Sequence, residues 1–241
     1  MGIFKIGKKK SFSVDRELSV DRSSWRDVLS ESLGYMMAVQ LAFGEIAVRD
    51  RDWDVDFSRG VIAFGEDEYP IQFIGSQSDV SNTWLWAWEN INGFDSSLLE
   101  LAEKTKQRGN EWGLEPLTKA QSELDDLLSG HTIASVACAI SEEKLCYYRC
   151  PYSGGAAFVA VRGVDETVFS GADIAAFAEI TMKCISEFDL DHRIFAESFL
   201  LRNRTPYEWD ANVLIAHFDR DLHIEFENKK GVLRIASIKT K

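Results

Sequence analysis

Residues 82–90 read N-T-W-L-W-A-W-E-N, which places Trp84, Trp86 and Trp88 at a strict spacing of two. Successive side chains of an extended backbone point to opposite faces, so this spacing predicts a strand with all three indoles on one side. Each indole carries a large apolar area and one N–H group that needs an acceptor when it is buried. Such a row of indoles lies either in a core layer or on a binding face, and the sequence does not decide between the two.

The residues before the tryptophans predict the remainder of a sheet. Within residues 51–57, apolar side chains alternate with three aspartates, Asp52, Asp54 and Asp56. This pattern is typical of a strand with one apolar and one acidic face. A short turn at 58–60 and apolar runs at 61–64 and 71–76 predict two further strands. With the tryptophan segment as the fourth strand, we expect a four-stranded antiparallel meander.

Helical spacing of apolar residues predicts helices that pack on this sheet. Ser24 and Asp27 form a variant of the capping box at the start of a helix over residues 24–48. Two further helices are expected over residues 97–109 and 118–130. The apolar run at 133–140 fits either a buried strand or a buried helix turn, and we favour the helix. After them, apolar strands at 145–150 and 156–161 flank P-Y-S-G-G, which predicts a hairpin.

The rest of the chain is richer in helical patterns. We expect helices over 172–188 and 191–202 and a last hairpin formed by 222–226 and 232–238. The predicted fold class is therefore α+β: a four-stranded antiparallel meander packed against helices, with a helix-rich C-terminal part ending in a β-hairpin. The predicted organisation is a disordered basic tail over 1–20, a meander-plus-helices core over 21–165, and a C-terminal part over 166–241 packed on the same domain.

Composition excludes several classes of protein. The chain has 39 acidic and 27 basic residues, a formal net charge of −12 at pH 7. Such a charge repels phosphate backbones, so we expect no nucleic-acid binding, and it favours solubility or a basic protein partner. The longest apolar run is too short to span a bilayer. The four cysteines lack C-x-x-C spacing, which favours reduced thiols in a cytoplasmic protein: Cys138, Cys146, Cys150 and Cys184.

The sequence contains none of the common catalytic or cofactor motifs. A nucleophile elbow, a phosphate-binding loop and a dinucleotide fingerprint are all missing, and the four histidines have no zinc-binding spacing. His217 or His223 beside Asp219 or Asp221 could serve as a general base, but such neighbours arise by chance in many proteins of this size. A flat aspartate row lacks the wrap-around geometry that Ca²⁺ or Mg²⁺ requires. We expect no metal and no cofactor and name no catalytic residue.

The chain resembles a family of uncharacterised bacterial proteins over roughly residues 25 to 165. The motifs that carry the resemblance are a W-x-x-D/D-x-x-x-G-x-I-x-F hairpin at 53–64, an I-G-S strand at 74–76, the T-W-L-W-A-W-x-N segment at 83–90 and a Y-Y-R-x-P-Y segment at 147–152. The tryptophan pattern is rare, so the resemblance is fairly specific. It implies a shared fold and no established activity.

These observations favour a non-enzymatic, cytoplasmic protein-interaction module with an acidic surface. In a concrete form, it is an immunity-type or chaperone-like protein that masks a basic protein partner. The alternative is an enzyme or small-ligand binder with a tryptophan-lined pocket. A third reading is a structural subunit of a larger assembly, and the sequence does not determine the oligomeric state. The candidate binding residues are Trp84, Trp86, Trp88, Trp53, Asp52, Asp54 and Asp56.

Overall fold

A computed structural model describes residues 17–241 of the chain. Most of the predicted basic tail, residues 1–16, lies outside the described residues, and residues 17–20 form neither helix nor strand. The described part is an α+β structure, which confirms the predicted fold class. None of its helices is long and apolar enough to cross a membrane.

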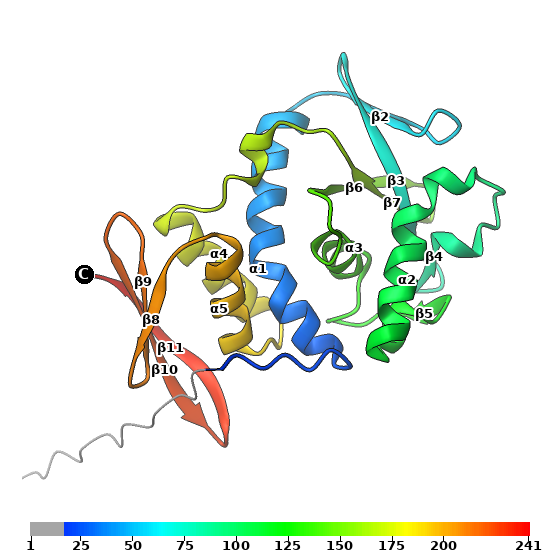
Figure 1. The fold of residues 1–241 in the computed structure, drawn as a ribbon. Coiled ribbons are helices and arrows are strands. Elements are labelled where there is room, and N and C mark those ends of the chain that lie inside the picture. Colours follow the sequence, from blue (N-terminus) through cyan, green and yellow to red (C-terminus); the bar gives the residue numbers. More distant parts are fainter. Residues whose placement is uncertain (1–16) are drawn as a thin grey trace, which may run out of the picture.

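Five α-helices and eleven β-strands make up the described part (Figure 1). The helices are α1 (Trp25–Phe43), α2 (Glu100–Trp112), α3 (Gly130–Ala139), α4 (Ile174–Glu187) and α5 (His192–Arg202). The first seven strands are β1 (Trp53–Asp56), β2 (Val61–Phe64), β3 (Asp67–Ser78), β4 (Thr83–Trp86), β5 (Gln121–Glu123), β6 (Cys146–Tyr152) and β7 (Gly155–Val161). The last four are β8 (Tyr207–Asp210), β9 (Val213–His217), β10 (Asp221–Lys229) and β11 (Val232–Thr240).

The N-terminal sheet is the predicted antiparallel meander with three strands added. Strands β1 to β5 are neighbours in sequence order, and the hairpin of β6 and β7 joins through β7, which pairs with β3. Strand β3 is long enough to serve both groups. Its first four residues pair with β2, and residues 71–78 pair with β7. The predicted meander and the predicted hairpin at 145–161 are therefore both confirmed.

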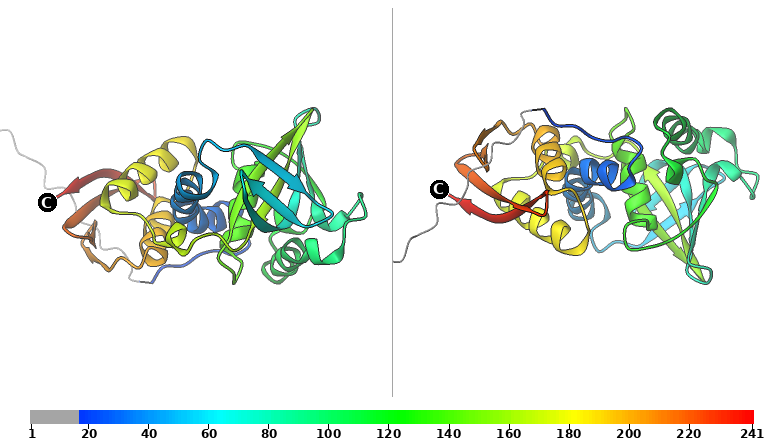
Figure 2. Two further views of the ribbon diagram at one scale, coloured as in Figure 1. Left: turned by 90° about the horizontal axis from the view of Figure 1, so that it is seen from above. Right: turned by 90° about the horizontal axis from the view of Figure 1, so that it is seen from below.

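Helix α1 runs through the middle of the molecule. The N-terminal sheet with α2 and α3 lies on one side of it, and α4, α5 and the C-terminal sheet lie on the other (Figure 1). Viewed from above and below, the molecule is elongated along the line that joins these two groups (Figure 2). A Cβ atom at Gly34 of α1 would lie 2.7 Å from the ring of Phe199, so this glycine lets α5 approach closely.

Three glutamine side chains connect the N-terminal sheet to the helices around it. Gln40 of α1 donates to the Tyr147 carbonyl (2.9 Å) and accepts from the Tyr147 N–H (3.0 Å), so it occupies the outer edge of β6 in the way a strand would. Buried Gln72 of β3 donates to the Ser97 carbonyl and accepts from the Leu101 N–H at the start of α2. Gln77 accepts from the first N–H of α3. Each amide satisfies backbone groups that a helix start or strand edge leaves open.

The C-terminal hairpin belongs to a four-stranded sheet. Strands β10 and β11 confirm the predicted hairpin, and β9 and β8 extend it in the order β11-β10-β9-β8. Sequence reasoning missed β8, which alternates inward apolar with outward polar side chains, and β9, whose run of apolar residues shows no such alternation. Helices α4 and α5 are confirmed within two residues of the predicted bounds at each end.

The predicted helix over 118–130 is wrong. This segment starts directly after a single 3₁₀ turn (Glu115–Leu117) and then forms strand β5, which pairs with β4. The carboxylate of Asp125 then accepts hydrogen bonds from the N–H groups of Leu127 and Leu128. This local turn competes with helix formation, as aspartate side chains commonly do. The apolar residues whose spacing suggested a helix, Leu124, Leu127 and Leu128, instead pack against the core from the turn that follows β5.

The tryptophan segment is extended for a shorter distance than expected. Strand β4 ends at Trp86, and Ala87–Glu89 forms a 3₁₀ turn that carries Trp88. The turn ends at Asn90, which has a φ of 44° and accepts from the Phe94 N–H while donating to the Phe94 carbonyl. Asparagine tolerates this left-handed conformation better than most residues. The predicted strand through all three tryptophans is therefore wrong after Trp86.

His192 connects α5 to the C-terminal sheet and makes stability depend on pH. Its Nδ1 atom accepts from the Ile235 N–H at 3.1 Å, and the residue is 7% exposed. Burial, with a contribution from the Arg234 and Arg26 guanidinium groups, lowers the pKa of His192 from 6.5 to about 4, although Asp191 and Asp189 act in the opposite direction. The native state therefore holds this imidazole neutral, with Nδ1 available as an acceptor.

We predict that acid weakens the fold through His192. The folded pKa lies below the unfolded pKa, so the unfolded chain binds more protons between pH 6.5 and about 4. The stabilisation is complete above pH 6.5 and falls by about 3 kcal/mol as the pH drops towards 4. Urea unfolding at several pH values measures it, with His192→Asn as a non-titrating control that keeps an acceptor. Equal pH slopes for both proteins in this window would contradict the prediction.

Candidate functional site

The three predicted indoles lie side by side in the interior of the N-terminal part. Trp84 and Trp86 meet edge to face with ring centroids 5.5 Å apart, and Trp86 stacks on Trp88 at 4.5 Å. Their exposures are 0%, 1% and 8%, respectively. Trp84 also contacts Phe158 of β7 at 5.5 Å, while Lys106 of α2 lies 5.1 Å from the Trp88 ring. The row therefore links the sheet to α2.

Gly75 in the I-G-S motif makes room for the first indole. A Cβ atom at this position would lie 2.4 Å from Cζ2 of Trp84 and 2.6 Å from the carbonyl oxygen of Leu85. Gly75 pairs with Trp86 on one side and with Phe158 on the other, so all three residues share the sheet face that the indoles cover. The I-G-S motif and the tryptophan motif are separate in the sequence, but in the fold Gly75 lies directly against the Trp84 ring.

The indole row leaves little space beside it. The hollow next to Trp86, closed by Asn90, Ile91 and Phe94, has a volume of about 20 Å³. Small-molecule sites commonly measure about 300–1,000 Å³. Trp86 donates its Nε1–H to the Pro116 carbonyl at 3.0 Å. The buried Nε1 atoms of Trp84 and Trp88 have no hydrogen-bond partner within residues 17–241. This arrangement is suited to packing.

The fourth candidate tryptophan belongs to a different cluster. Trp53 of β1 is partly buried, and its ring contact is with Tyr148 of β6, 5.4 Å between centroids. Tyr148 in turn meets Phe64, which packs on Phe43 at the end of α1. These rings fill the inner face of the β1–β3 ribbon, by which we mean strands β1 and β2 and residues 67–70 of β3. Trp53 therefore does not extend the indole row.

The predicted aspartate row lies on the opposite, outer face of the β1–β3 ribbon. Asp54 pairs directly with Ala63 of β2, which pairs with Glu68 of β3, so these three side chains share one face. Asp52 and Asp54 are exposed, and neither side chain forms a hydrogen bond or ion pair within residues 17–241. The outer face thus presents two free carboxylates beside a small apolar residue. Sequence reasoning missed Glu68, which only the register of β3 brings to this face.

Asp56 is part of the same row but has a structural role. Its Oδ1 atom accepts from the Ser58 N–H (2.9 Å), the Ser58 hydroxyl (2.6 Å) and the Arg59 N–H (3.1 Å). The Ser58 hydroxyl bond is the main cause that lowers the pKa of Asp56. This carboxylate therefore shapes the β1–β2 turn, as aspartate does in many turns.

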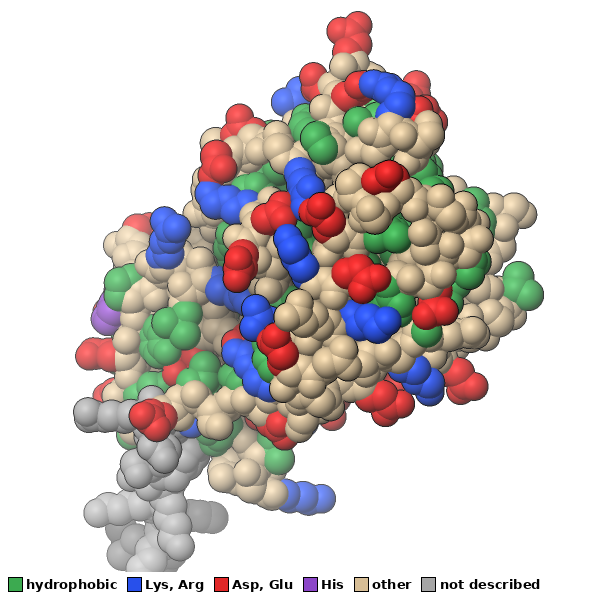
Figure 3. Space-filling view, turned by 45° about the vertical axis from the view of Figure 1, so that its right-hand side comes forward, with side chains coloured by type: hydrophobic (Ala, Val, Ile, Leu, Met, Phe, Trp, Pro, Cys, Tyr) green, Lys and Arg blue, Asp and Glu red, His purple; other side chains and the backbone are tan. Residues whose placement is uncertain are grey.

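Other carboxylates of the ribbon are neutralised by arginines. Arg59 holds Glu68 through two parallel hydrogen bonds of 2.8 Å, and Arg51 pairs with Asp67 at 2.5 Å. Figure 3 shows acidic and basic side chains interspersed over one face of the molecule, with carboxylates at its upper tip. Within residues 17–241, Asp52 and Asp54 are the carboxylates of the ribbon's aspartate row that form no ion pair or hydrogen bond through their side chains.

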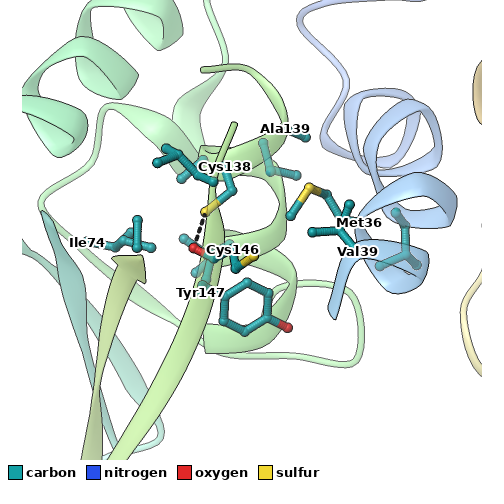
Figure 4. Close-up of a cluster of buried hydrophobic side chains, with 14 of the residues drawn as sticks. Met36, Val39, Ile74, Cys138, Ala139, Cys146 and Tyr147 are labelled. Atoms are coloured by element: carbon teal, nitrogen blue, oxygen red, sulfur yellow. Dashed lines mark hydrogen bonds between the residues drawn. The ribbon is translucent and has the colours of Figure 1, made fainter. Parts of the chain in front are cut away.

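The cysteines are buried, and two histidines each lie beside a single polar side chain, His131 beside the Tyr147 hydroxyl at 3.2 Å and His217 beside Asp221. All four cysteines are buried and free, and Cys138 donates its thiol to the Cys146 carbonyl inside an apolar cluster (Figure 4). Burial raises the pKa of Cys146 to about 12, so its thiol is unreactive at neutral pH. His217 lies 2.9 Å from Asp221, and both are exposed. Within residues 17–241 no group of three or more His, Cys, Asp or Glu is placed to hold a metal.

Three larger hollows lie in the described part. One, of about 460 Å³, separates α2 from the loop after α3 and is lined by Lys104, Arg108 and Glu142, among others. Another, of about 480 Å³, lies beside β4 and β5 and is lined by Thr83, Pro116 and Gln121, among others. The third, of about 490 Å³, lies between α4 and β11 and is mostly apolar, with Met182 half exposed at its rim. None of the three is lined by a candidate tryptophan or aspartate.

Comparison with known proteins gives one match. Residues 26–164 match the model of a family described as "Family of unknown function (DUF6882)", which covers more than half of the chain. The match begins at the start of α1 and ends just after β7, so it contains the N-terminal sheet, the indole row and the β1–β3 ribbon. No curated protein and no solved structure matches.

We predict that Gly75→Ala lowers the free energy of unfolding by more than about 2 kcal/mol, because its methyl group displaces Trp84. Gly44→Ala is the matched control: Gly44 has helical φ and ψ angles, and a Cβ there would contact nothing within 4 Å. Alanine should be neutral or stabilising at that position. Urea denaturation measures both, and equal effects of the two substitutions would contradict the assigned contact.

Proposed function

We propose that this chain, which through residues 26–164 belongs to the Family of unknown function (DUF6882), is a non-enzymatic module that binds a basic protein partner through the outer face of its β1–β3 ribbon. The observation that carries the proposal is the pair of exposed carboxylates, Asp52 and Asp54, which form no ion pair within residues 17–241, on a strand whose other face packs on Tyr148 through Trp53. In a concrete form, the protein masks a basic effector, as an immunity protein or a chaperone does.

The charge of the whole molecule supports the same proposal. The whole chain has a net charge of −12. Because residues 1–16 have a net charge of +4, residues 17–241 have a net charge of −16. A strongly negative surface accelerates association with a positive partner and opposes association with nucleic acid. Four buried, free cysteines fit a reducing compartment, and we propose a location in a bacterial cytoplasm.

The alternative function, a small-ligand binder or enzyme with a tryptophan-lined pocket, has less support. The indoles that would line the pocket are almost fully buried, and the hollow beside them has only about 20 Å³. Buried thiols and an exposed His217–Asp221 pair offer no assembled acid–base site. The acidic face needs no rearrangement to meet a partner.

A lysine-rich peptide tests the proposal. We predict that a fluorescein-labelled peptide of alternating lysine and threonine binds the protein, and that raising the salt concentration from about 0.05 M to about 0.5 M weakens binding because exposed charges are screened. Asp52→Asn with Asp54→Asn should weaken binding about fivefold at low salt, since two exposed ion pairs are lost. Fluorescence anisotropy measures the affinity.

The matched control removes the same charge elsewhere. Glu103→Gln with Asp126→Asn neutralises two exposed carboxylates that form no ion pair within the described residues. This control should change the affinity less than about twofold, because its charges are screened from the ribbon. If the control and the Asp52/Asp54 variant weaken binding equally, general acidity and not the ribbon face attracts the peptide, and the proposal fails.

A further inference from the structure

We propose that the basic partner binds as an added β-strand along the free edge of β1. This inference rests on the proposed function, since it concerns the same face, and it names how the partner is held. An unpaired strand edge offers a row of backbone donors and acceptors that an extended peptide can complete. The charge row on β1 then selects which peptide is accepted.

The direction of the backbone groups on β1 follows from its pairing with β2. Asp52 accepts from the Gly65 N–H at 2.8 Å, so its carbonyl points towards β2. In an antiparallel pair, alternate residues point their N–H and C=O groups to opposite sides. Trp53 and Val55 therefore point both groups away from β2, and no strand of the described part pairs with that edge. An added strand would find four backbone groups in line.

Other strand edges in the described part are partly occupied or short. Gln40 occupies the edge of β6 at Tyr147, and His192 binds the Ile235 N–H on β11. Strand β5 has three residues. Strand β8 resembles β1 in length and in its outward carboxylates, Glu208 and Asp210. We assign the partner to β1, whose row carries three aspartates, and the variants below separate the two edges.

The two faces of the ribbon define the sequence that an added strand needs. A residue opposite Asp52 or Asp54 lies on the outer face and meets a free carboxylate, so lysine or arginine fits there. The residue between them points to the face that holds Trp53 and Val55, so an apolar side chain fits there. The recognised segment is basic–apolar–basic at consecutive positions. A second copy of β1 does not fit, because its aspartates would face Asp52 and Asp54 and repel them.

Two peptides of equal composition separate strand addition from charge attraction alone. One alternates lysine and valine, and the other carries its lysines in a block. We expect the alternating peptide to bind about tenfold more tightly, as about two additional backbone hydrogen bonds would give. Two N-methylated forms of the alternating peptide test this further, one methylated at its valines and the other at its lysines. One form should lose the gain and the other should keep it, because only alternate N–H groups of an added strand bond to β1.

A change in the protein checks the edge from the other side. Val55→Pro removes an N–H that points away from β2, so the ribbon should persist, which far-UV circular dichroism and thermal unfolding verify. This variant should bind the alternating peptide no better than the block peptide. Equal binding of both peptides to the unmodified protein overturns strand addition and leaves the proposed function intact. Binding of neither peptide overturns both. A double variant of β8, Glu208→Gln with Asp210→Asn, should still bind the alternating peptide more tightly than the block peptide. If this preference is lost in the β8 variant and kept in Val55→Pro, the assignment to β1 is overturned.

Discussion

The contact between Trp84 and Gly75 is the constraint on which the rest of the N-terminal part depends. The indole lies so close to β3 that no side chain is tolerated beneath it. Phe158 extends the contact to β7, and its own ring lies 2.5 Å from where a Cβ of Gly130 would be, at the start of α3. Two glycines thus let aromatic rings hold four elements at fixed separations. Aromatic burial of this extent contributes strongly to stability.

This packing leaves the outer surface for function. The sheet face that carries the indole row is filled, and the inner face of the β1–β3 ribbon is covered by the rings of Trp53 and Tyr148. The side chains of Asp52 and Asp54 contribute no hydrogen bond to the fold in the described part. Exposed carboxylates of this kind add little to stability, so we infer that they act by binding or repelling other molecules. An acidic row also keeps an open strand edge from pairing with copies of itself.

Local patterns predicted most of the fold, and long-range pairing explains what they missed. The cap at Ser24, the alternation in β1 and the helical spacing of α4 all concern neighbouring residues, and all were predicted correctly. The segment 118–130 was predicted wrongly, because β5 exists only through its pairing with β4. The link from Gln40 to Tyr147 joins residues 107 positions apart and leaves no local signal. The candidate tryptophans and aspartates were found by their spacing, whereas their separation into an interior row and an outer face required the register of the sheet.

Hydrogen exchange at the indole nitrogens tests most directly whether the tryptophan row is core. The Nε1–H groups of Trp84, Trp86 and Trp88 are assigned by NMR with ¹⁵N-labelled tryptophan and followed after transfer to D₂O. We predict that all three exchange only through opening of the domain, at rates that rise together when urea lowers its stability. Exchange of any of the three at the rate of an exposed indole, independent of urea, would contradict it and would return the row to the surface.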